Sequence, residues 1–138
     1  MPTATKATNA TAEERTFLER HGERLSPSTH RAKWIHSPDE RPDRKGQTLA
    51  TRSGDVIRAW AEERGGRPAA ATRGKDDGWP HVLRIRFGEG SGNLEEIGWD
   101  EWLGTFEERE LVFLYQQQRR DGSQSNFFRL DNPNREDG

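Results

Sequence analysis

The four histidines are the residues best suited to acid–base or nucleophilic chemistry in this chain. Nucleophilic catalysis needs a Ser, Thr or Cys beside a base that a third group orients. His21, His30 and His36 fall in a stretch rich in prolines and charges, which predicts little fixed structure, and only His81 lies elsewhere. We therefore expect no catalytic residue, and the sequence favours a non-enzymatic protein over an enzyme.

Two pairs of neighbouring carboxylates offer a second route to acid–base chemistry. Asp100 is followed by Glu101, and Glu107 by Glu108. Adjacent residues on a helix point to different sides, so neither pair forms a facing acid and base. Helix capping and solubility explain these acidic residues better than catalysis does.

Metal and cofactor sites are not predicted either. The chain has no cysteine, and His30 and His36 stand six residues apart, which matches no common ligand spacing. The glycine-rich stretch GEGSGN, residues 88–93, follows an expected strand, but the helix that a dinucleotide-binding fingerprint requires does not follow it. We interpret this stretch as a hairpin turn and expect neither metal nor cofactor.

Basic residues are the remaining candidates for chemistry, because they can contact phosphates. The sequence RGGRP, residues 64–68, resembles the core of the minor-groove-binding AT-hook over three or four residues. The alternative is that Gly65 and Gly66 end a helix and that Arg67 is solvated. The basic segment THRAKW…RPDRK adds positive charge near the N-terminus, whereas a net charge of −2 and a pI near 6.1 argue against strong sequence-independent binding. The candidate contacts to a partner or to nucleic acid are Trp34, Arg64, Arg67, Arg73, Lys75, Arg84 and Arg86.

Composition limits the chain to one ordinary domain and indicates its surroundings. Charged residues (33%) outnumber hydrophobic ones (29%), so part of the chain is expected to bury too little surface to fold. Absence of cysteine is compatible with a reducing compartment. No apolar run is long enough for a membrane span, and the N-terminus lacks the apolar core of a signal peptide. We expect a cytoplasmic protein that does not contact membranes.

Residues 1–52 are predicted to form a largely irregular, partly disordered arm. They hold ten Lys or Arg against seven Asp or Glu and few large apolar side chains. Thr11 and Glu14 have the spacing of a capping box, which predicts a short helix near residues 12–20. Trp34 is the side chain expected to anchor the arm to the folded part or to remain exposed.

The spacing of apolar residues in residues 53–132 predicts a compact α+β domain. Residues 133–138 are predicted to form a polar tail. Helical stripes predict helices at residues 53–64 and 100–108, and alternation predicts a strand at residues 82–87. The apolar run LVFLY predicts a strand covered on both faces, and Asp121 with Gly122 predicts a hairpin to a final strand. We expect a small, mainly antiparallel sheet with two packed helices. The expected core is Val56, Ile57, Trp60, Leu83, Ile85, Phe87, Trp99, Trp102, Leu103, Phe106, Val112, Leu114 and Phe128.

The assembled motifs WAEERGGRPA, VLRIRF, LEEIGWDEWL, LVFLYQ and DGSQSNFF resemble a group of small bacterial proteins with no established function. The resemblance covers about residues 29–133. It implies no catalytic or binding residue. Some members of the group are labelled glucan-branching enzymes, although such catalysis requires a barrel-sized scaffold that this chain is too short to build.

Three functions remain open from the sequence. The first is a non-enzymatic accessory or interaction module whose arm orders on a macromolecular partner, with a protein partner favoured over nucleic acid. The second is a nucleic-acid-associated protein that uses RGGRP, the strand arginines and the basic arm. The third, which the sequence favours least, is a small enzyme of carbohydrate metabolism. The oligomeric state is left open.

Overall fold

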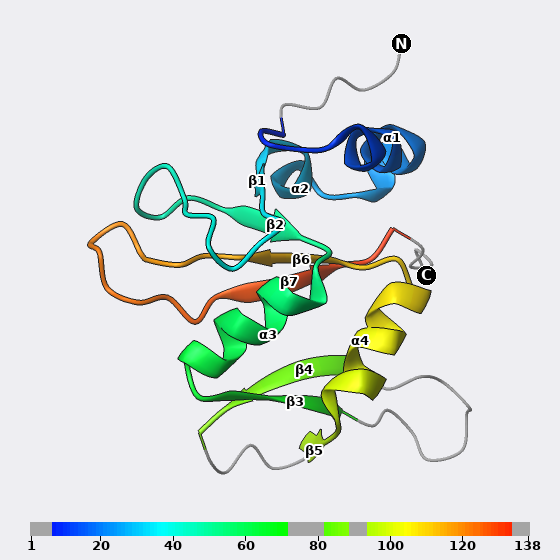
Figure 1. The fold of residues 1–138 in the computed structure, drawn as a ribbon. Coiled ribbons are helices and arrows are strands. Elements are labelled where there is room, and N and C mark those ends of the chain that lie inside the picture. The colour runs from blue at the N-terminus through cyan, green and yellow to red at the C-terminus, as the bar shows by residue number, and fades with distance from the viewer. Residues whose placement is uncertain (1–6, 72–81, 89–93, 134–138) are drawn as a thin grey trace.

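The computed structural model describes residues 7–71, 82–88 and 94–133. It confirms the α+β class and the mainly antiparallel pairing of the strands, which form two sheets rather than one (Figure 1). The helices are α1 (Ala12–His21), η1 (Gly22–Arg24), α2 (Pro27–Arg31), α3 (Gly54–Glu63) and α4 (Trp99–Glu108), and the strands are β1 (Lys33–Trp34), β2 (Leu49–Thr51), β3 (Gly66–Ala71), β4 (Val82–Phe87), β5 (Leu94–Glu96), β6 (Val112–Tyr115) and β7 (Phe128–Asp131).

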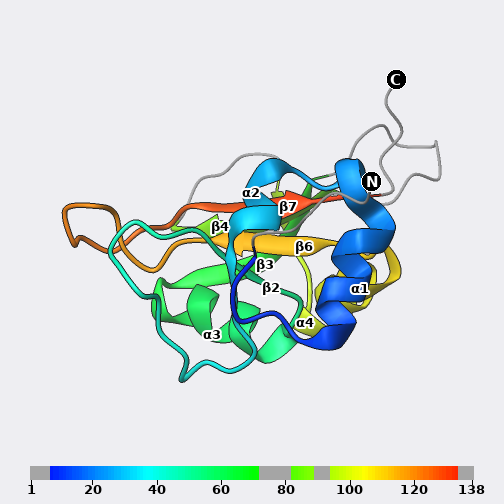
Figure 2. The ribbon, with the colours of Figure 1, turned by 90° about the horizontal axis from the view of Figure 1, so that it is seen from above.

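The two sheets lie on either side of α3 and α4. Sheet A has the strand order β1-β2-β6-β7, with β1 parallel to β2 and the other neighbours antiparallel. Sheet B has the order β4-β3-β5 and is antiparallel throughout. In Figure 1, α1 and α2 lie above sheet A, while α3 and α4 lie between sheet A and sheet B. Figure 2 shows α1 and α2 from above, over the outer face of sheet A.

Strand β6 is buried on both faces, as its continuous apolar run predicts. Successive side chains of a strand point to opposite faces. Phe113 and Tyr115 accordingly join the main core with α3, α4 and sheet B, whereas Val112 and Leu114 join a second core beneath α1. β6 therefore joins the two cores of the molecule.

Helices α3 and α4 present their predicted apolar stripes to the main core. The indole Nε1 of Trp102 donates to the carbonyl of Arg84 (2.9 Å), and that of Trp60 donates to the carbonyl of Gln116 (2.9 Å). These two buried indoles of the main core therefore each have a polar partner. Nine of the thirteen expected core residues are buried. The other four, Phe87, Trp99, Leu103 and Phe128, are partly buried and pack against the main core.

The N-terminal segment differs from the expected irregular arm, because much of it is folded onto sheet A. Thr11 and Glu14 form the predicted capping box of α1, and β2 pairs with β6 across the expected boundary at residue 52. The apolar residues of the segment are too few to fold alone, but they bury against the Val112 and Leu114 face of β6. Trp34 is 0% exposed in this second core.

Gly65 and Gly66 lie at the end of helix α3 and the start of β3. This agrees with the alternative to the AT-hook, in which the two glycines end a helix. Gly65 has φ +69°, the left-handed conformation that commonly follows the end of a helix. Gly66 begins β3, where an added Cβ would lie 2.7 Å from Ile85 Cγ2. Residues 66–68 are thus paired within sheet B and do not form a free extended hook. In the described ranges, no helix combines the length and apolar character needed to cross a bilayer.

Candidate functional site

The residues predicted to contact a partner do not gather in one place. Trp34 is enclosed in the second core, so its ring is not available to a partner. Arg67, Arg84 and Arg86 lie on the outer face of sheet B. Arg73 and Lys75 lie outside the described residues. The prediction that Trp34 is a contact residue is therefore corrected, because the arm is folded.

Arg64 is also buried rather than exposed to a partner, with 1% of its side chain accessible. Its guanidinium lies over the Trp60 ring, 4.5 Å from the ring centroid. Nε donates to the carbonyl of Ser125 (2.6 Å), and Nη2 donates to the carbonyl of Gln117 (3.0 Å). Burial lowers the pKa of Arg64 from its ordinary value, and the adjacent Glu63 opposes that effect. Arg64 thus ties the chain on both sides of the β6–β7 turn to α3.

The arginines of sheet B form a small cationic face. Arg67 and Arg86 are directly opposite each other on β3 and β4, and Arg84 pairs with Ala69 two positions along. Arg67 makes an ion pair with Glu96 (3.4 Å), and Arg86 Nε donates to the carbonyl of Gly88 (3.2 Å). Directly opposed like charges destabilise an antiparallel pair slightly, so this face carries an unfavourable interaction that a bound anion would relieve.

The histidines show no arrangement for catalysis in the part of the chain that the structure describes. His36 lies between Glu14 (2.7 Å) and Glu40 (3.3 Å), and His30 Nε2 contacts the carbonyl of Gly22 (2.7 Å). Burial, followed by the charge of Arg20, lowers the pKa of His21. Within the described ranges, no group of three or more His, Cys, Asp or Glu side chains is placed to hold a metal ion.

A buried polar cluster joins α2 to β7. The Asp131 carboxylate accepts hydrogen bonds from the backbone N–H of Ser26 (2.8 Å) and from the hydroxyl of Thr29. Asp131 and Thr29 are 0% exposed, so no substrate reaches them. These hydroxyl and carboxylate groups hold a helix end in place and do not form a reactive centre.

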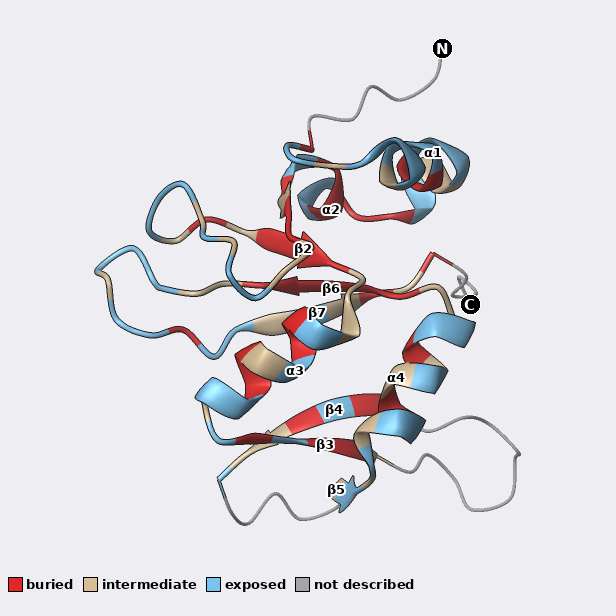
Figure 3. Ribbon diagram, viewed as in Figure 1, coloured by how far each residue is buried: buried red, intermediate tan, exposed pale blue. Residues whose placement is uncertain are grey.

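The clearest candidate site is built from two loops that are far apart in the sequence. Residues 41–48 precede β2 and residues 116–127 connect β6 to β7, and both project from the same end of sheet A (Figure 1, left). We call residues 41–48 and 116–127 the paired loops. The backbone N–H of Gly46 donates to the carbonyl of Gln118 (3.1 Å), and Gln116 Nε2 donates to the carbonyl of Gly46 (3.2 Å). Figure 3 shows that much of both loops is exposed.

The paired loops contain five basic residues against two acidic ones, whereas the whole chain has a net charge of −2. Both acidic groups are already engaged. A hydrogen bond from Lys33 is the main cause that lowers the pKa of Asp43, and a hydrogen bond from Ser123 does the same for Asp121. All five basic side chains are exposed: Arg41, Arg44, Lys45, Arg119 and Arg120.

One basic side chain of each loop packs against a glycine of the other loop. Arg120 Cγ lies 2.7 Å from the position that a Cβ on Gly46 would occupy. Lys45 Nζ lies 3.3 Å from the equivalent position on Gly122. Each loop thus has a glycine where a long basic side chain of the other loop crosses it.

A groove opens at the base of the paired loops. Its floor is held by hydrogen bonds, because the Ser125 hydroxyl donates to Gln116 Oε1 (3.1 Å) and accepts from the backbone N–H of Phe127 (3.1 Å). Phe127 is 48% exposed and is the one large hydrophobic side chain that is exposed among the described residues. The groove is lined by Thr48, Gln116, Arg119, Ser125, Asn126 and Phe127.

Two other hollows on the surface have cations that are already paired. Beside α1, Arg20 bonds Glu110 (2.7 Å), and Arg52 lies over the Phe17 ring (4.8 Å). Beside β3, the hollow that borders Trp99 contains Arg67, which pairs with Glu96. Neither hollow offers a set of uncompensated charges comparable to the paired loops.

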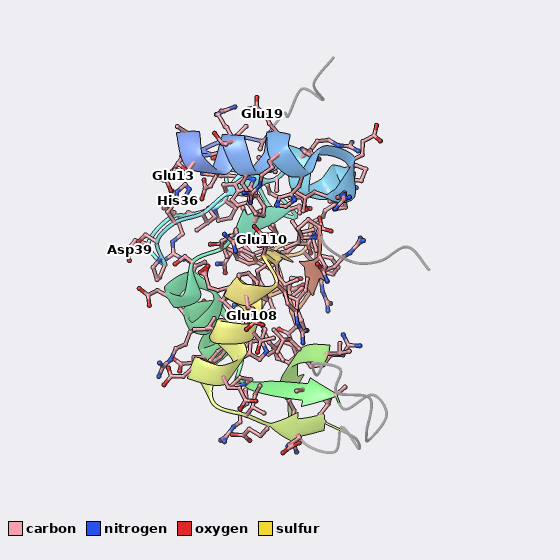
Figure 4. All side chains as sticks on the ribbon, turned by 90° about the vertical axis from the view of Figure 1, so that its right-hand side faces the viewer. Glu13, Glu19, His36, Asp39, Glu108 and Glu110 are labelled. Atoms are coloured by element: carbon pink, nitrogen blue, oxygen red, sulfur yellow. The ribbon has the colours of Figure 1, made fainter. Side chains whose placement is uncertain are left out.

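Several acidic side chains lie on the side of the molecule that is turned away from the paired loops. Figure 4 shows Glu13 and Glu19 on α1, Glu108 at the end of α4 and Glu110 just after it, on that side. Glu13, Glu19 and Glu108 are exposed. Basic side chains lie there too, because α1 also carries Arg20, which pairs with Glu110.

Comparisons with known proteins identify no relative: no protein-family model, no curated protein and no solved structure matches the chain. The candidate site is therefore defined by its geometry alone. The sequence analysis identified the basic segment RPDRK, which lies in one of the two loops. It predicted only a hairpin turn for the other loop, residues 116–127.

Proposed function

We propose that the protein is a non-enzymatic module that binds nucleic acid through the paired loops. The observation that carries this proposal is that two loops bonded to each other hold five exposed basic side chains, whereas their two acidic groups are locally engaged. A phosphate backbone presents a regular row of negative charges, and such a surface neutralises several of them at once.

The net charge of −2 is compatible with this proposal because binding depends mainly on the charges close to the ligand. At physiological ionic strength, exposed charges more than about 8 Å apart are largely screened from each other. A polyanion at the paired loops interacts mainly with their cations and only weakly with Glu19 or Glu108 on the opposite side.

The paired loops are also fixed before any ligand binds. Arg64 holds Gln117 and Ser125 from below, and Gly46 is hydrogen-bonded to the hairpin at two points. A surface that is already ordered loses less conformational entropy on association. This rigidity supports a binding role for the loops.

A protein partner is the second candidate, and the outer face of sheet B supports it. The opposed Arg67 and Arg86 would be stabilised by an acidic segment lying across β3 and β4. The arm-mediated form of this hypothesis loses its support, because Trp34 is buried and residues 7–52 pack on sheet A.

The test is salt-dependent binding of a fluorescently labelled oligonucleotide of about 20 nucleotides, measured by anisotropy. Three to five neutralised phosphates give a loss of affinity of roughly 20- to 100-fold between about 50 and 200 mM salt. A double variant, Lys45→Glu with Arg119→Glu, should abolish measurable binding.

The matched control is Arg15→Glu with Arg24→Glu, which makes the same change in net charge at two exposed positions away from the paired loops. This control should bind almost as well as the wild-type protein. Binding without a salt dependence, or equal loss in both double variants, would exclude the paired loops as the binding surface.

A further inference from the structure

We infer that the nucleic acid is a single strand and that Phe127 stacks on one of its bases. This inference rests on the proposed function and names the form of its ligand. It is carried by the exposed ring of Phe127, which lies in the same groove as Arg119 and Asn126.

The fold itself gives no reason for an aromatic residue at position 127. The next residue, Phe128, supplies the aromatic contact to the core, where its ring lies 5.7 Å from that of Phe113 and 6.1 Å from that of Trp60. Phe127 points away from this cluster and leaves about half of its surface in water. A ligand that covers the ring would remove this apolar surface from water, which favours the bound state.

The backbone that carries the ring is fixed. The N–H of Phe127 donates to the Ser125 hydroxyl (3.1 Å), and its carbonyl accepts from the N–H of Gln116 (3.4 Å). Arg64 Nε in turn holds the carbonyl of Ser125 (2.6 Å). The ring is thus presented by a rigid turn and forms a preformed platform.

The polar groups beside the ring suit a nucleotide. Arg119 also lines the groove, and its guanidinium can contact a phosphate. Asn126 is exposed, and its amide both donates and accepts, as the edge of a base requires. The Gln116 amide is already bonded to Gly46 and Ser125, so it forms the wall of the groove.

A single strand fits this arrangement better than a duplex. In a duplex the faces of the bases are stacked on each other and hidden, so an aromatic platform gains nothing from it. In a single strand the bases are free to stack on aromatic side chains while the backbone follows a basic surface. Lys45 and Arg120 lie where such a backbone continues across the paired loops.

The experiment compares the wild-type protein with Phe127→Leu and Phe127→Trp, using a labelled single strand of about 15 nucleotides that contains 2-aminopurine. Leu keeps much of the apolar surface but lacks a π-face, so its affinity should fall roughly 5- to 150-fold. Trp should restore binding. Stacking should quench the 2-aminopurine emission for the wild-type protein and for Phe127→Trp only. Unlabelled single strand should compete better than the duplex of the same sequence.

The outcomes separate the inference from the proposed function. If the duplex competes as well as the single strand and Phe127→Leu binds normally, nucleic-acid binding stands and the single-strand inference is overturned. Equal competition by polyglutamate would show a general anion surface and would also overturn it. If no oligonucleotide binds at any salt concentration, the proposed function itself fails. Matching thermal unfolding of the three proteins would show that the substitutions leave the fold intact.

Discussion

Arg64 links helix α3 to the paired loops through its side chain. Its guanidinium is buried, stacked over Trp60, and bonded to backbone carbonyls on both sides of the hairpin. Buried charges of this kind persist only when their donors are satisfied. The planar fork of arginine reaches several acceptors at once, which the single ammonium of lysine does not. Arg64 therefore acts on binding by positioning the groove.

Arg64→Lys should lower the free energy of unfolding by about 1–3 kcal/mol, because the positive charge remains buried but loses most of its acceptors. Affinity for a single strand should also fall, since Ser125 and Phe127 are no longer held. Urea denaturation measures the first effect, and anisotropy measures the second. Arg58→Lys is the control, because Arg58 lies on the same helix and makes only an exposed pair with Glu62. Equal stability of the two variants would contradict the role given to Arg64.

Several residues could be assigned from the sequence, and others could not. Thr11 and Glu14 form the capping box that their spacing predicts, because a cap depends on local geometry. Arg64 was predicted as a contact residue because it begins RGGRP, which resembles the core of an AT-hook. Its burial depends on residues more than 50 positions later, which no local pattern shows.

Strand β6 is the element on which both cores depend. Its alternate side chains belong to the main core and to the second core, and it pairs with β2 and β7. The apolar run predicted a strand covered on both faces, but not the identity of the cover. The cover on one face comes from four apolar residues of the N-terminal segment: Phe17, Leu18, Leu25 and Trp34. Apolar residues are so sparse in that segment that its sequence did not indicate a core. Tertiary contact compensates here for weak local signals.

Residues 7–52 should unfold together with β6. The amide of Trp34 donates to Thr8 O (2.8 Å) and that of Ile35 donates to Ala50 O (2.8 Å). In the isolated protein, hydrogen exchange at these two amides should be within about tenfold of exchange at the β6 amides. An arm that orders only on a partner predicts rapid exchange at Trp34 and Ile35, so that result would contradict the fold of the N-terminal segment.

At the scale of the whole molecule, the local excess of basic residues in the paired loops matters more than the total charge. The net charge of −2 follows from composition alone, and its sign and small size argued against strong binding of nucleic acid. It also named RPDRK as a basic segment and Asp121 with Gly122 as a turn. That the two segments lie side by side follows from the pairing of β2 with β6, which was not predicted. For this reason the site was missed although both of its halves were noticed.

Removing acidic charge from the opposite side should increase binding only at low salt. Glu19→Gln with Glu108→Gln changes the net charge from −2 to 0 and alters neither paired loop. We expect the association rate with a single strand to rise about 2- to 3-fold at about 20 mM salt, because long-range repulsion decreases. Stopped-flow fluorescence measures this rate. The increase should vanish at about 500 mM salt, and an increase that persists there would indicate a local effect instead.

The crossing of the two loops at Gly46 and Gly122 also restricts how the chain can vary. Arg120 packs on one loop and Lys45 on the other, so each loop sets the length that its neighbour must have. An insertion in residues 41–48 would separate Gly46 from Gln118 and Gln116 unless the hairpin lengthened with it. Loop length is usually the freest variable of a fold, but in this protein the two lengths should change only as a pair.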